Sequence, residues 1–433
     1  MRRRTFVHGW GAIAGLLCAM VAGLTKVCAD ESPSVSPQPA GSAVVEATPG
    51  ITLDELIALA ESSSPNLRQA AADVEAARGK AYQAGLYPNP TLSGGGNQIV
   101  GNQSQYFGAM SQEIVTKHKL RLDRAAACRE VYQAEQMFVK ARFELLTTVR
   151  QSFVTALAAQ RRTEVLTRLV EIVGKSQQAA QRLQQAGEGT RSDSLLFEIE
   201  LEKAELGLEN NEARWQASRR QLVANMGLRN LTIERLVGNL TESMDGVAQQ
   251  VLLDGYVPYN AAVQSAEHGV ERNRFLLQRA LVQPFPNITV YSGYQYQIEP
   301  RLHNMAILQA SVPLPLWNRN EGNIAAAQAE VNRAEATVEQ IQNEIARQMA
   351  DAAGRYRIAD QQAKRYADRI VPRAREGVKI MQEGFAQGQF DFLRLLQTQR
   401  ALVEANLGYI DALETRWSAA AQLAGLAQIE AFP

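Results

Sequence analysis

The sequence contains an internal repeat at a spacing of about 200 residues, and this repeat limits the possible folds more than any other feature. Ala125-Ala126-Ala127 recurs as Ala325-Ala326-Ala327, and Arg214-Trp215 recurs as Arg416-Trp417. An apolar series also recurs: Val131, Ala134, Phe138, Ala141, Leu145 and Val149 correspond to Val331, Ala334, Val338, Ile341, Ile345 and Met349. A chain with such a duplicated unit is expected to form an extended structure such as a tube, rather than an enzyme with a catalytic cleft.

The first 29 residues have the pattern of a secretory signal peptide. Three arginines at positions 2–4 precede an apolar run over residues 9–24, and Val27-Cys28-Ala29 fits a cleavage site. An uncleaved anchor is the alternative, but a membrane-spanning helix needs about 20 apolar residues and this run is shorter. We therefore expect an exported protein.

The charge of the mature chain argues against a nucleic-acid partner. The full chain has 45 basic and 45 acidic residues. Cleavage of the signal peptide would remove four basic residues (Arg2, Arg3, Arg4 and Lys26), so the net charge of the mature chain is 41 − 45 = −4. A nucleic-acid-binding protein is expected to carry a basic patch or a basic net charge.

Two long segments predict unusually long helices. Residues 120–186 contain no proline, which at 1.5 Å per residue gives a helix of roughly 100 Å. Residues 322–387 are as long and are broken only by Pro372 and a few glycines. Their apolar residues recur at alternating steps of three and four, the pattern of helix–helix packing. With return helices over 193–226 and 392–423, the sequence predicts two long helical hairpins.

Four shorter segments predict β-strands. From 288 to 298 apolar and polar residues alternate with a period of two, over about eleven residues, the length that crosses a bilayer as a tilted strand. A partner strand is expected over 305–312, and a weaker pair over 91–99 and 105–112. The alternative is an ordinary half-buried hairpin, but the export signal favours a membrane barrel. The residues then expected to face lipid are Ile288, Val290, Tyr294 and Tyr296.

Four strands cannot close a barrel, because about eight is the practical minimum. The open edges must then pair with other copies of the chain, which predicts a cyclic homo-oligomer. The domain organisation expected is a signal peptide (1–29), an extended linker (30–50), a first repeat (51–240), a connection (241–258), a second repeat (259–426) and a C-terminal tail (427–433).

An ordered series of motifs resembles the TolC-like outer-membrane efflux channel family, and is closest to its CzcC-like branch of heavy-metal exporters. The N-terminal motifs are Thr52-Leu53-Asp54-Glu55-Leu56, Pro65-Asn66-Leu67-Arg68 and Gln83-Ala84-Gly85-Leu86-Tyr87-Pro88-Asn89-Pro90. The strand-to-helix motif runs from Val312 to Gly322, and Ala186-Gly187-Glu188 with Glu198-Ile199-Glu200-Leu201 resembles the tip of the first hairpin.

The resemblance implies a mainly α-helical protein with a small β part. Each chain of a homotrimer would give four strands to a twelve-stranded outer-membrane β-barrel, in contact with lipid, and two coiled-coil hairpins to a periplasmic α-barrel. The trimer would be the exit channel of a tripartite efflux pump, most simply for heavy-metal cations. Its partners would be a periplasmic adaptor (membrane fusion) protein and an inner-membrane RND-type transporter.

The resemblance also assigns roles to the hairpin tips. The adaptor would dock on Gly187, Glu188 and Gly189 of the first tip and on Gly388 and Gln389 of the second. A gate would lie one turn above, at Asp193, Arg394 and Gln397, where Asp193 pairs with Arg394. The family places acidic residues where Arg394 and Gln397 stand. Simple helix caps at the glycines, and a capping role for Asp193, are the alternatives.

The chain has no recognisable catalytic or metal-binding motif, and we expect neither an enzyme nor a cofactor. Its four histidines are isolated, and no Cys/His/Asp cluster has the spacing of metal ligands. Two other classes remain: a periplasmic coiled-coil adaptor, which would need one hairpin rather than two, and a scaffold without a pore, which would not need the alternation after residue 288.

Overall fold

The computed structural model describes residues 50–97, 104–186, 190–242, 256–297, 303–386, 392–430 and 432, all within the compact unit Thr48–Pro433. Helix α1 (Leu53–Ser63) begins with a capping box, in which the Glu55 amide donates to Thr52 Oγ1 and the Thr52 amide donates to Glu55 Oε2. Helix α2 (Pro65–Ala84) follows at once, with Pro65 in its first turn.

The two predicted hairpins are present, with bounds close to those expected. The first consists of α3 (Lys119–Gln185) and α4 (Arg191–Asn225). The second consists of α7 (Glu321–Arg365), α8 (Val371–Ala386) and α9 (Phe392–Leu426). A short 3₁₀ turn, η1 (Val257–Tyr259), and helix α6 (Ala261–Val282) precede the second pair of strands. Helix α6 was not predicted, although it is the repeat counterpart of α2.

The second long helix is interrupted next to Pro372, where the sequence predicted a break. A π-helical segment, η2 (Tyr366–Ile370), joins α7 to α8. Pro372 explains its position, since proline has no amide hydrogen and its ring clashes with the carbonyl four residues earlier, at Asp368. Widening the helix there removes the clash, and π-helical segments of this kind are usually single turns.

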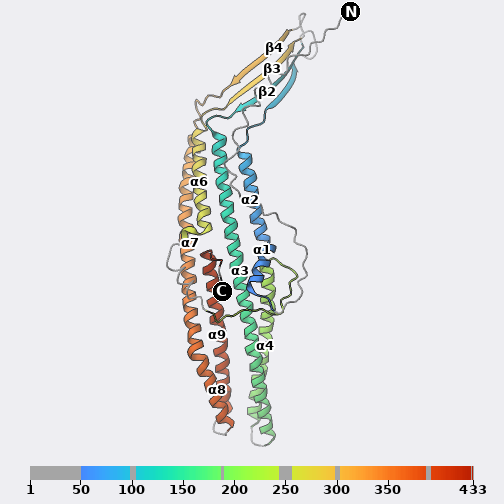
Figure 1. Ribbon diagram of the computed structural model, residues 1–433, viewed down its shortest axis with the longest axis vertical. Coiled ribbons are helices and arrows are strands. Elements are labelled where there is room, and N and C mark those ends of the chain that lie inside the picture. Colours follow the sequence, from blue (N-terminus) through green and yellow to red (C-terminus); the bar gives the residue numbers. More distant parts are fainter. Residues whose placement is uncertain are drawn as a thin grey trace, which may run out of the picture. The chain divides into compact units, whose positions relative to one another are not determined.

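The four strands form one antiparallel sheet in sequence order: β1 (Thr91–Asn97), β2 (Gln105–Ile114), β3 (Ile288–Gln297) and β4 (His303–Ser311). The central pair, β2 with β3, joins the two repeats over the whole length of both strands, from Gln105 opposite Gln297 to Ile114 opposite Ile288. Strands β1 and β4 are the edges of the sheet within the chain. Figure 1 shows the sheet at the end of the helices α2, α3, α6 and α7, to which its strands connect.

Helix α3 is the centre of the packing, because it contacts α2, α4, α6 and α9. The main core cluster lies around its middle and includes Val149 and Leu157 with Trp417 of α9.

The internal repeat is also visible in the way that the two return helices, α4 and α9, end. After α4, the Gly227 and Leu228 amides donate to the Ala224 and Val223 carbonyls, and after α9 the amides of Gln428 and Ile429 bond in the same way to Gly425 and Ala424. Among the described residues no helix is apolar enough over a sufficient length to cross a membrane.

Candidate functional site

The strand register divides the sheet into an apolar and a polar face. Residues paired across neighbouring strands point to the same side, so the even-numbered positions of all four strands share one face. That face carries Leu92, Tyr106, Met110, Ile114, Ile288, Val290, Tyr294, Tyr296 and Leu308. Its edge residues Leu92 and Leu308 are 83% and 80% exposed. The opposite face is mostly polar, with Gln105, Glu113, Gln295, Gln297 and Gln309.

The joint between sheet and helices is tied by a buried lysine. Lys119 lies in the first turn of α3, is 3% exposed, and donates from Nζ to the Phe285 carbonyl (2.5 Å) and to Asn287 Oδ1 (2.9 Å). Burial, and then the nearby Arg279, lower the pKa of Lys119. Asn287 Nδ2 donates in turn to Glu113 Oε1 at 2.6 Å. These bonds connect Lys119 and Glu113 of the first repeat to the segment of the second repeat that leads into β3. They therefore join the two repeats at the point where the sheet meets the helices.

Exposed apolar side chains continue past the end of the sheet. In the loop between β4 and α7, Leu314, Leu316 and Trp317 are 72%, 63% and 94% exposed. Polar residues follow directly, and Asn320 stands at the start of α7 with a φ of 65°. An apolar band that ends in an exposed tryptophan and then in polar residues is typical of a membrane–water interface.

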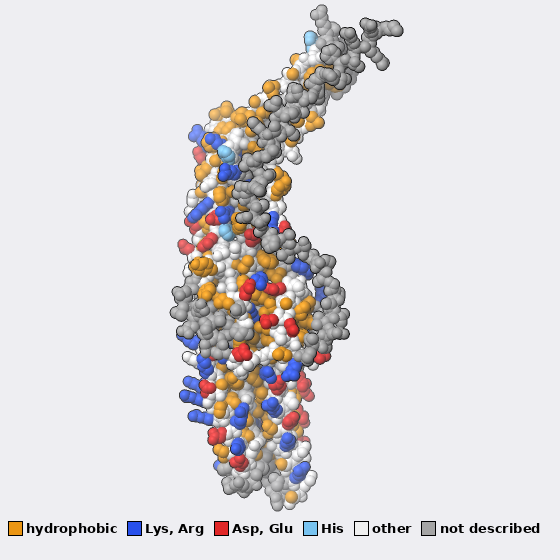
Figure 2. Space-filling view, in the orientation of Figure 1, with side chains coloured by type: hydrophobic (Ala, Val, Ile, Leu, Met, Phe, Trp, Pro, Cys, Tyr) orange, Lys and Arg blue, Asp and Glu red, His pale blue; other side chains and the backbone are white. Residues whose placement is uncertain are grey.

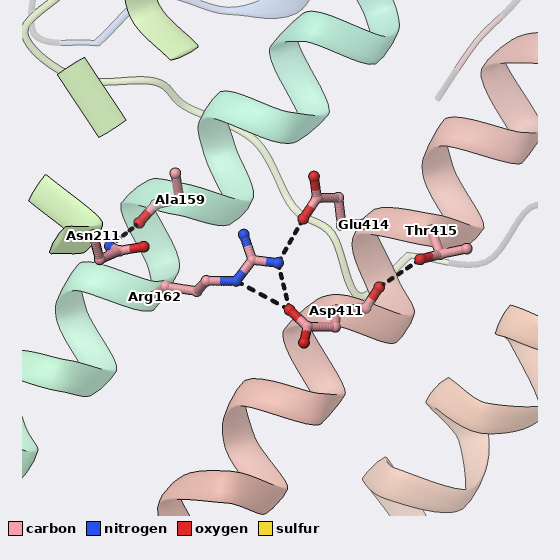
Figure 3. A network of polar contacts seen from close by, with 6 residues as sticks. All are labelled: Ala159, Arg162, Asn211, Asp411, Glu414 and Thr415. Atoms are coloured by element: carbon pink, nitrogen blue, oxygen red, sulfur yellow. Dashed lines mark hydrogen bonds and ion pairs between the residues drawn. The ribbon is translucent and has the colours of Figure 1, made fainter. Parts of the chain in front are cut away.

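The two hairpins are held together by an ion network at mid-length. Figure 3 shows Arg162 of α3 between two carboxylates of α9. Its Nε is 3.1 Å from Asp411 Oδ1, and its Nη2 donates to the same atom and to Glu414 Oε2, the latter at 2.6 Å. The Arg162 side chain is 9% exposed. Burial alone would lower its pKa, but the hydrogen bonds to Asp411 and Glu414 outweigh it and the pKa of Arg162 is raised.

A second network ties α9 to the segment after the first hairpin. Arg416, 5% exposed, lies 3.4 Å from Asp360 of α7 and donates to the carbonyls of Leu240 (2.9 Å) and Glu242 (2.6 Å). Trp417 Nε1 also donates to the Leu240 carbonyl, at 2.7 Å. The repeated pair Arg214-Trp215 has no such role, since Arg214 is exposed.

A third contact lies nearer the tips. Arg400 of α9 pairs with Glu200 of α4, and Lys203 lies 3.2 Å from the same carboxylate. Burial raises the pKa of Glu200, but the hydrogen bonds from Arg400 and Lys203 are stronger in sum and hold it below its ordinary value. Beside this pair, Phe197 and Leu396 form a small buried cluster with Ala180. We call the Glu200–Arg400 pair the hairpin link.

The predicted tip and gate residues are placed only in part. Gly187, Glu188, Gly189, Gly388 and Gln389 lie outside the described residues. Asp193 is in the first turn of α4, and its side chain is also outside the described part, while Arg394 and Gln397 are exposed on α9. The predicted pair of Asp193 with Arg394 therefore stays a prediction.

The sequence analysis missed the hairpin link, although its logic could have found it. Glu200 and Arg400 stand at similar depths in the two return helices, nine and eight residues after Arg191 and Phe392. Extending the alignment of Asp193 with Arg394 by two turns places Glu200 opposite Ala401, one residue from Arg400. Within the described residues, no three His, Cys, Asp or Glu side chains come together as metal ligands.

The chain matches a known protein family over both repeats. The family model described as "Outer membrane efflux protein" covers residues 56–228 and 259–427. The chain is 26% identical over 380 residues to the cobalt-zinc-cadmium resistance protein CzcC of Cupriavidus metallidurans, an alignment that covers 87% of this chain and 89% of that protein.

Solved outer-membrane proteins have the same fold. A structure of CusC is similar with a TM-score of 0.75 at 16% identity, covering 92% of this chain and 98% of CusC. The outer membrane protein VceC of Vibrio cholerae has a TM-score of 0.73 at 18% identity, covering 87% of this chain and 95% of VceC. These likenesses confirm the predicted fold class of long helical hairpins joined to four strands.

Proposed function

The chain belongs to the outer membrane efflux protein family, and from this premise we propose that it is the exit channel of a tripartite pump that expels heavy-metal cations. It is an outer-membrane protein with a large periplasmic helical portion. Membership of the family supports the efflux role. The metal cargo, the trimeric assembly and the partner proteins are proposals.

The observation that carries the channel assembly is the four-stranded sheet with one apolar face and two edges that are open within the chain. In lipid every backbone N–H and C=O must be paired, so β1 and β4 need neighbours. A second and third copy supply them, and twelve strands are enough to close a barrel. The polar face then lines the lumen, and Ile288, Val290, Tyr294 and Tyr296 face lipid.

The cargo is proposed from the similarity to CzcC, whose name states resistance to cobalt, zinc and cadmium. The metal is cargo rather than a resident cofactor. An inner-membrane RND-type transporter would supply it, and a periplasmic adaptor would seal the passage to the hairpin tips.

A direct test uses purified protein and metal-sensitive cells. In a planar bilayer the detergent-extracted trimer should form ion-conducting pores. Cells that lack their own exit channel should regain tolerance to cobalt, zinc or cadmium when the chain is expressed with its adaptor and transporter. A stable monomer in detergent by light scattering would contradict the barrel, whereas pores without any metal tolerance would contradict only the cargo.

We expect the hairpin link to help keep the resting channel closed. Only Arg400 of this pair is exposed, and one such pair near the surface contributes on the order of 1 kcal/mol, but three symmetric copies act together on one entrance. Arg400→Gln should raise the open probability in planar bilayers, and Lys203→Gln, which keeps Arg400, is the matched control. Because the pKa of Glu200 is lowered, the link is present at neutral pH and is lost as the pH falls through that lowered value. Acidification should then open the wild type and leave Arg400→Gln unchanged.

The predicted Asp193–Arg394 pair is tested in the same recordings. If Asp193→Ala, Arg394→Ala and the double variant all leave the open probability unchanged while Arg400→Gln raises it, Glu200–Arg400 is the link and the tip pair is not. Equal effects of both pairs would extend the link from the tip over two turns.

We expect the tip glycines to serve docking. Gly388→Val should abolish metal efflux while the trimer remains in the outer membrane, because a β-branched residue opposes the tight turn and close approach that a docking tip needs. The measurement is metal tolerance beside trimer abundance in outer-membrane fractions. Loss of the trimer itself would mean that Gly388 only ends a helix.

A further inference from the structure

A pocket of about 360 Å³ lies between the end of α4 and the segment 228–233 that follows it. Its buried lining is apolar and includes Val223 and Ile233. Its polar lining consists of Gln216, Thr232 and three guanidinium groups, those of Arg219, Arg220 and Arg229. Figure 2 shows that basic side chains are otherwise interspersed with acidic ones along the visible face of the helices. The charged groups that line this pocket, by contrast, are all positive.

The pocket is preformed by the chain reversal after α4. Gly227 has a φ of +77°, and a Cβ there would come within 2.5 Å of Pro65 Cδ, so the tight turn requires glycine. Beyond the pocket, the backbone of Leu236 accepts from and donates to the Gln160 side chain, at 3.2 and 3.0 Å. Residues 228–233 are thus fixed at both ends against the helices.

The arginines of the pocket have no acidic partner in the part of the chain that the structure describes. Arg219 donates to the Ile233 carbonyl at 2.6 Å and lies 5.0 Å from the ring centroid of Trp215, which orients it. Arg220 and Arg229 are exposed and make no ion pair there. The negative end of the helix dipole does not account for them, since the last turn of α4 has no basic residue and the dipole acts mainly within that turn.

The chemistry of the pocket selects a carboxylate ligand with a small apolar part. A guanidinium group binds a carboxylate through two parallel hydrogen bonds, and two unpaired groups favour a ligand with more than one carboxylate. The apolar lining favours short aliphatic side chains beside the charges. The concave shape admits the free end of a short peptide better than the flat surface of a folded partner.

The position of the pocket suggests the source of such a ligand. Gln160, which holds the segment, is 41 residues after the start of α3 at Lys119 (160 − 119), or roughly 60 Å along the helix from the sheet. Helices that extend this far from the outer membrane pass through the space that holds the peptidoglycan layer. The stem peptides of peptidoglycan are short, carry alanine methyl groups and end in free carboxylates.

We propose that the pocket between α4 and residues 228–233 binds the carboxylates of peptidoglycan stem peptides and so anchors the channel in the cell wall. Arg220 and Arg229 pair with the carboxylates, Arg219 and Thr232 complete the polar contacts, and the apolar lining receives a methyl group. This site lies at the opposite end of α4 from the hairpin tip and Asp193, so its loss should leave pore formation intact.

The test is calorimetric titration of the full mature protein in detergent with the synthetic tripeptide L-alanyl-γ-D-glutamyl-meso-diaminopimelic acid. Wild type should bind it, and Arg220→Gln/Arg229→Gln should bind at least about tenfold more weakly, the loss expected when one charge-assisted hydrogen bond is removed. The matched control is Arg214→Gln/Arg235→Gln, which removes two exposed arginines of the same region that do not line the pocket. It should bind like wild type.

Two further arms keep the proposal open to refutation. The fully amidated tripeptide should not bind wild type, so the need for the ligand's carboxylates is tested even if the pocket variant fails to assemble. Purified sacculi should sediment with wild type and with the control, and not with the pocket variant. No binding of the tripeptide, equal weakening in both double variants, or binding of an acidic partner protein but not of sacculi would each overturn the wall as the ligand.

Discussion

Val290→Arg should reduce the assembled trimer in the outer membrane far more than Thr289→Arg, by about 2–4 kcal/mol in assembly free energy near the bilayer midplane. The two positions are neighbours on β3 and face opposite ways. Val290 pairs with Gln112 and Ala310 on the apolar face, whereas Thr289 pairs with Glu113 and Ser311 on the polar face. An arginine at 290 would have to leave water for lipid, while one at 289 would lie beside a carboxylate.

The measurement is the fraction of heat-modifiable trimer in outer-membrane preparations, with refolding into lipid vesicles for the free-energy difference. Val290→Leu is the size control and should assemble like wild type, because it keeps the face apolar. A larger loss for Thr289→Arg would show that the lipid face and the lumen face are exchanged. Equal and small losses would mean that the sheet does not lie in a membrane.

The sequence was sufficient for the periodic elements and much less so for the contacts between them. The long helices and the alternation after Ile288 were predicted because each follows one period over many residues. Helix α6 was not predicted, because its 22 residues repeat the helical period over far fewer turns than the long helices do. The break at Pro372 was predicted, but its form, a π-helical turn before the proline, was not, because sequence periodicity does not show how a helix accommodates a proline.

The contacts between hairpins could not be read from local patterns. Arg162 meets Asp411 across nearly 250 residues, and neither the helix period nor the repeat relates the two positions. The repeat also does not predict the contacts of Arg416. Its counterpart Arg214 is exposed, whereas Arg416 is buried and donates to the carbonyls of residues 240 and 242. The two halves therefore share their elements but differ where they pack against each other.

Arg162→Met should lower the stability of the chain by about 3 kcal/mol, because it leaves the largely buried Glu414, whose side chain is 18% exposed, without its cation. The guanidinium is the only positive group that Figure 3 shows between the two carboxylates of α9. Arg161→Met is the matched control, since Arg161 is the neighbouring residue on the same helix and its ion pair in the described part of the chain is with the exposed Glu164. That change should cost no more than about 0.5 kcal/mol.

The measurement is the thermal unfolding of the detergent-solubilised protein followed by circular dichroism, with trimer migration recorded in parallel. Adding Asp411→Asn and Glu414→Gln to Arg162→Met should recover part of the loss, because the uncompensated charges are then gone and the amides keep their size. A loss that stays the same in the triple variant would assign the effect to packing of the long side chain instead. If Arg161→Met and Arg162→Met are equally mild, the network at mid-length does not hold the hairpins together, and the apolar core around Leu157 and Trp417 does so alone.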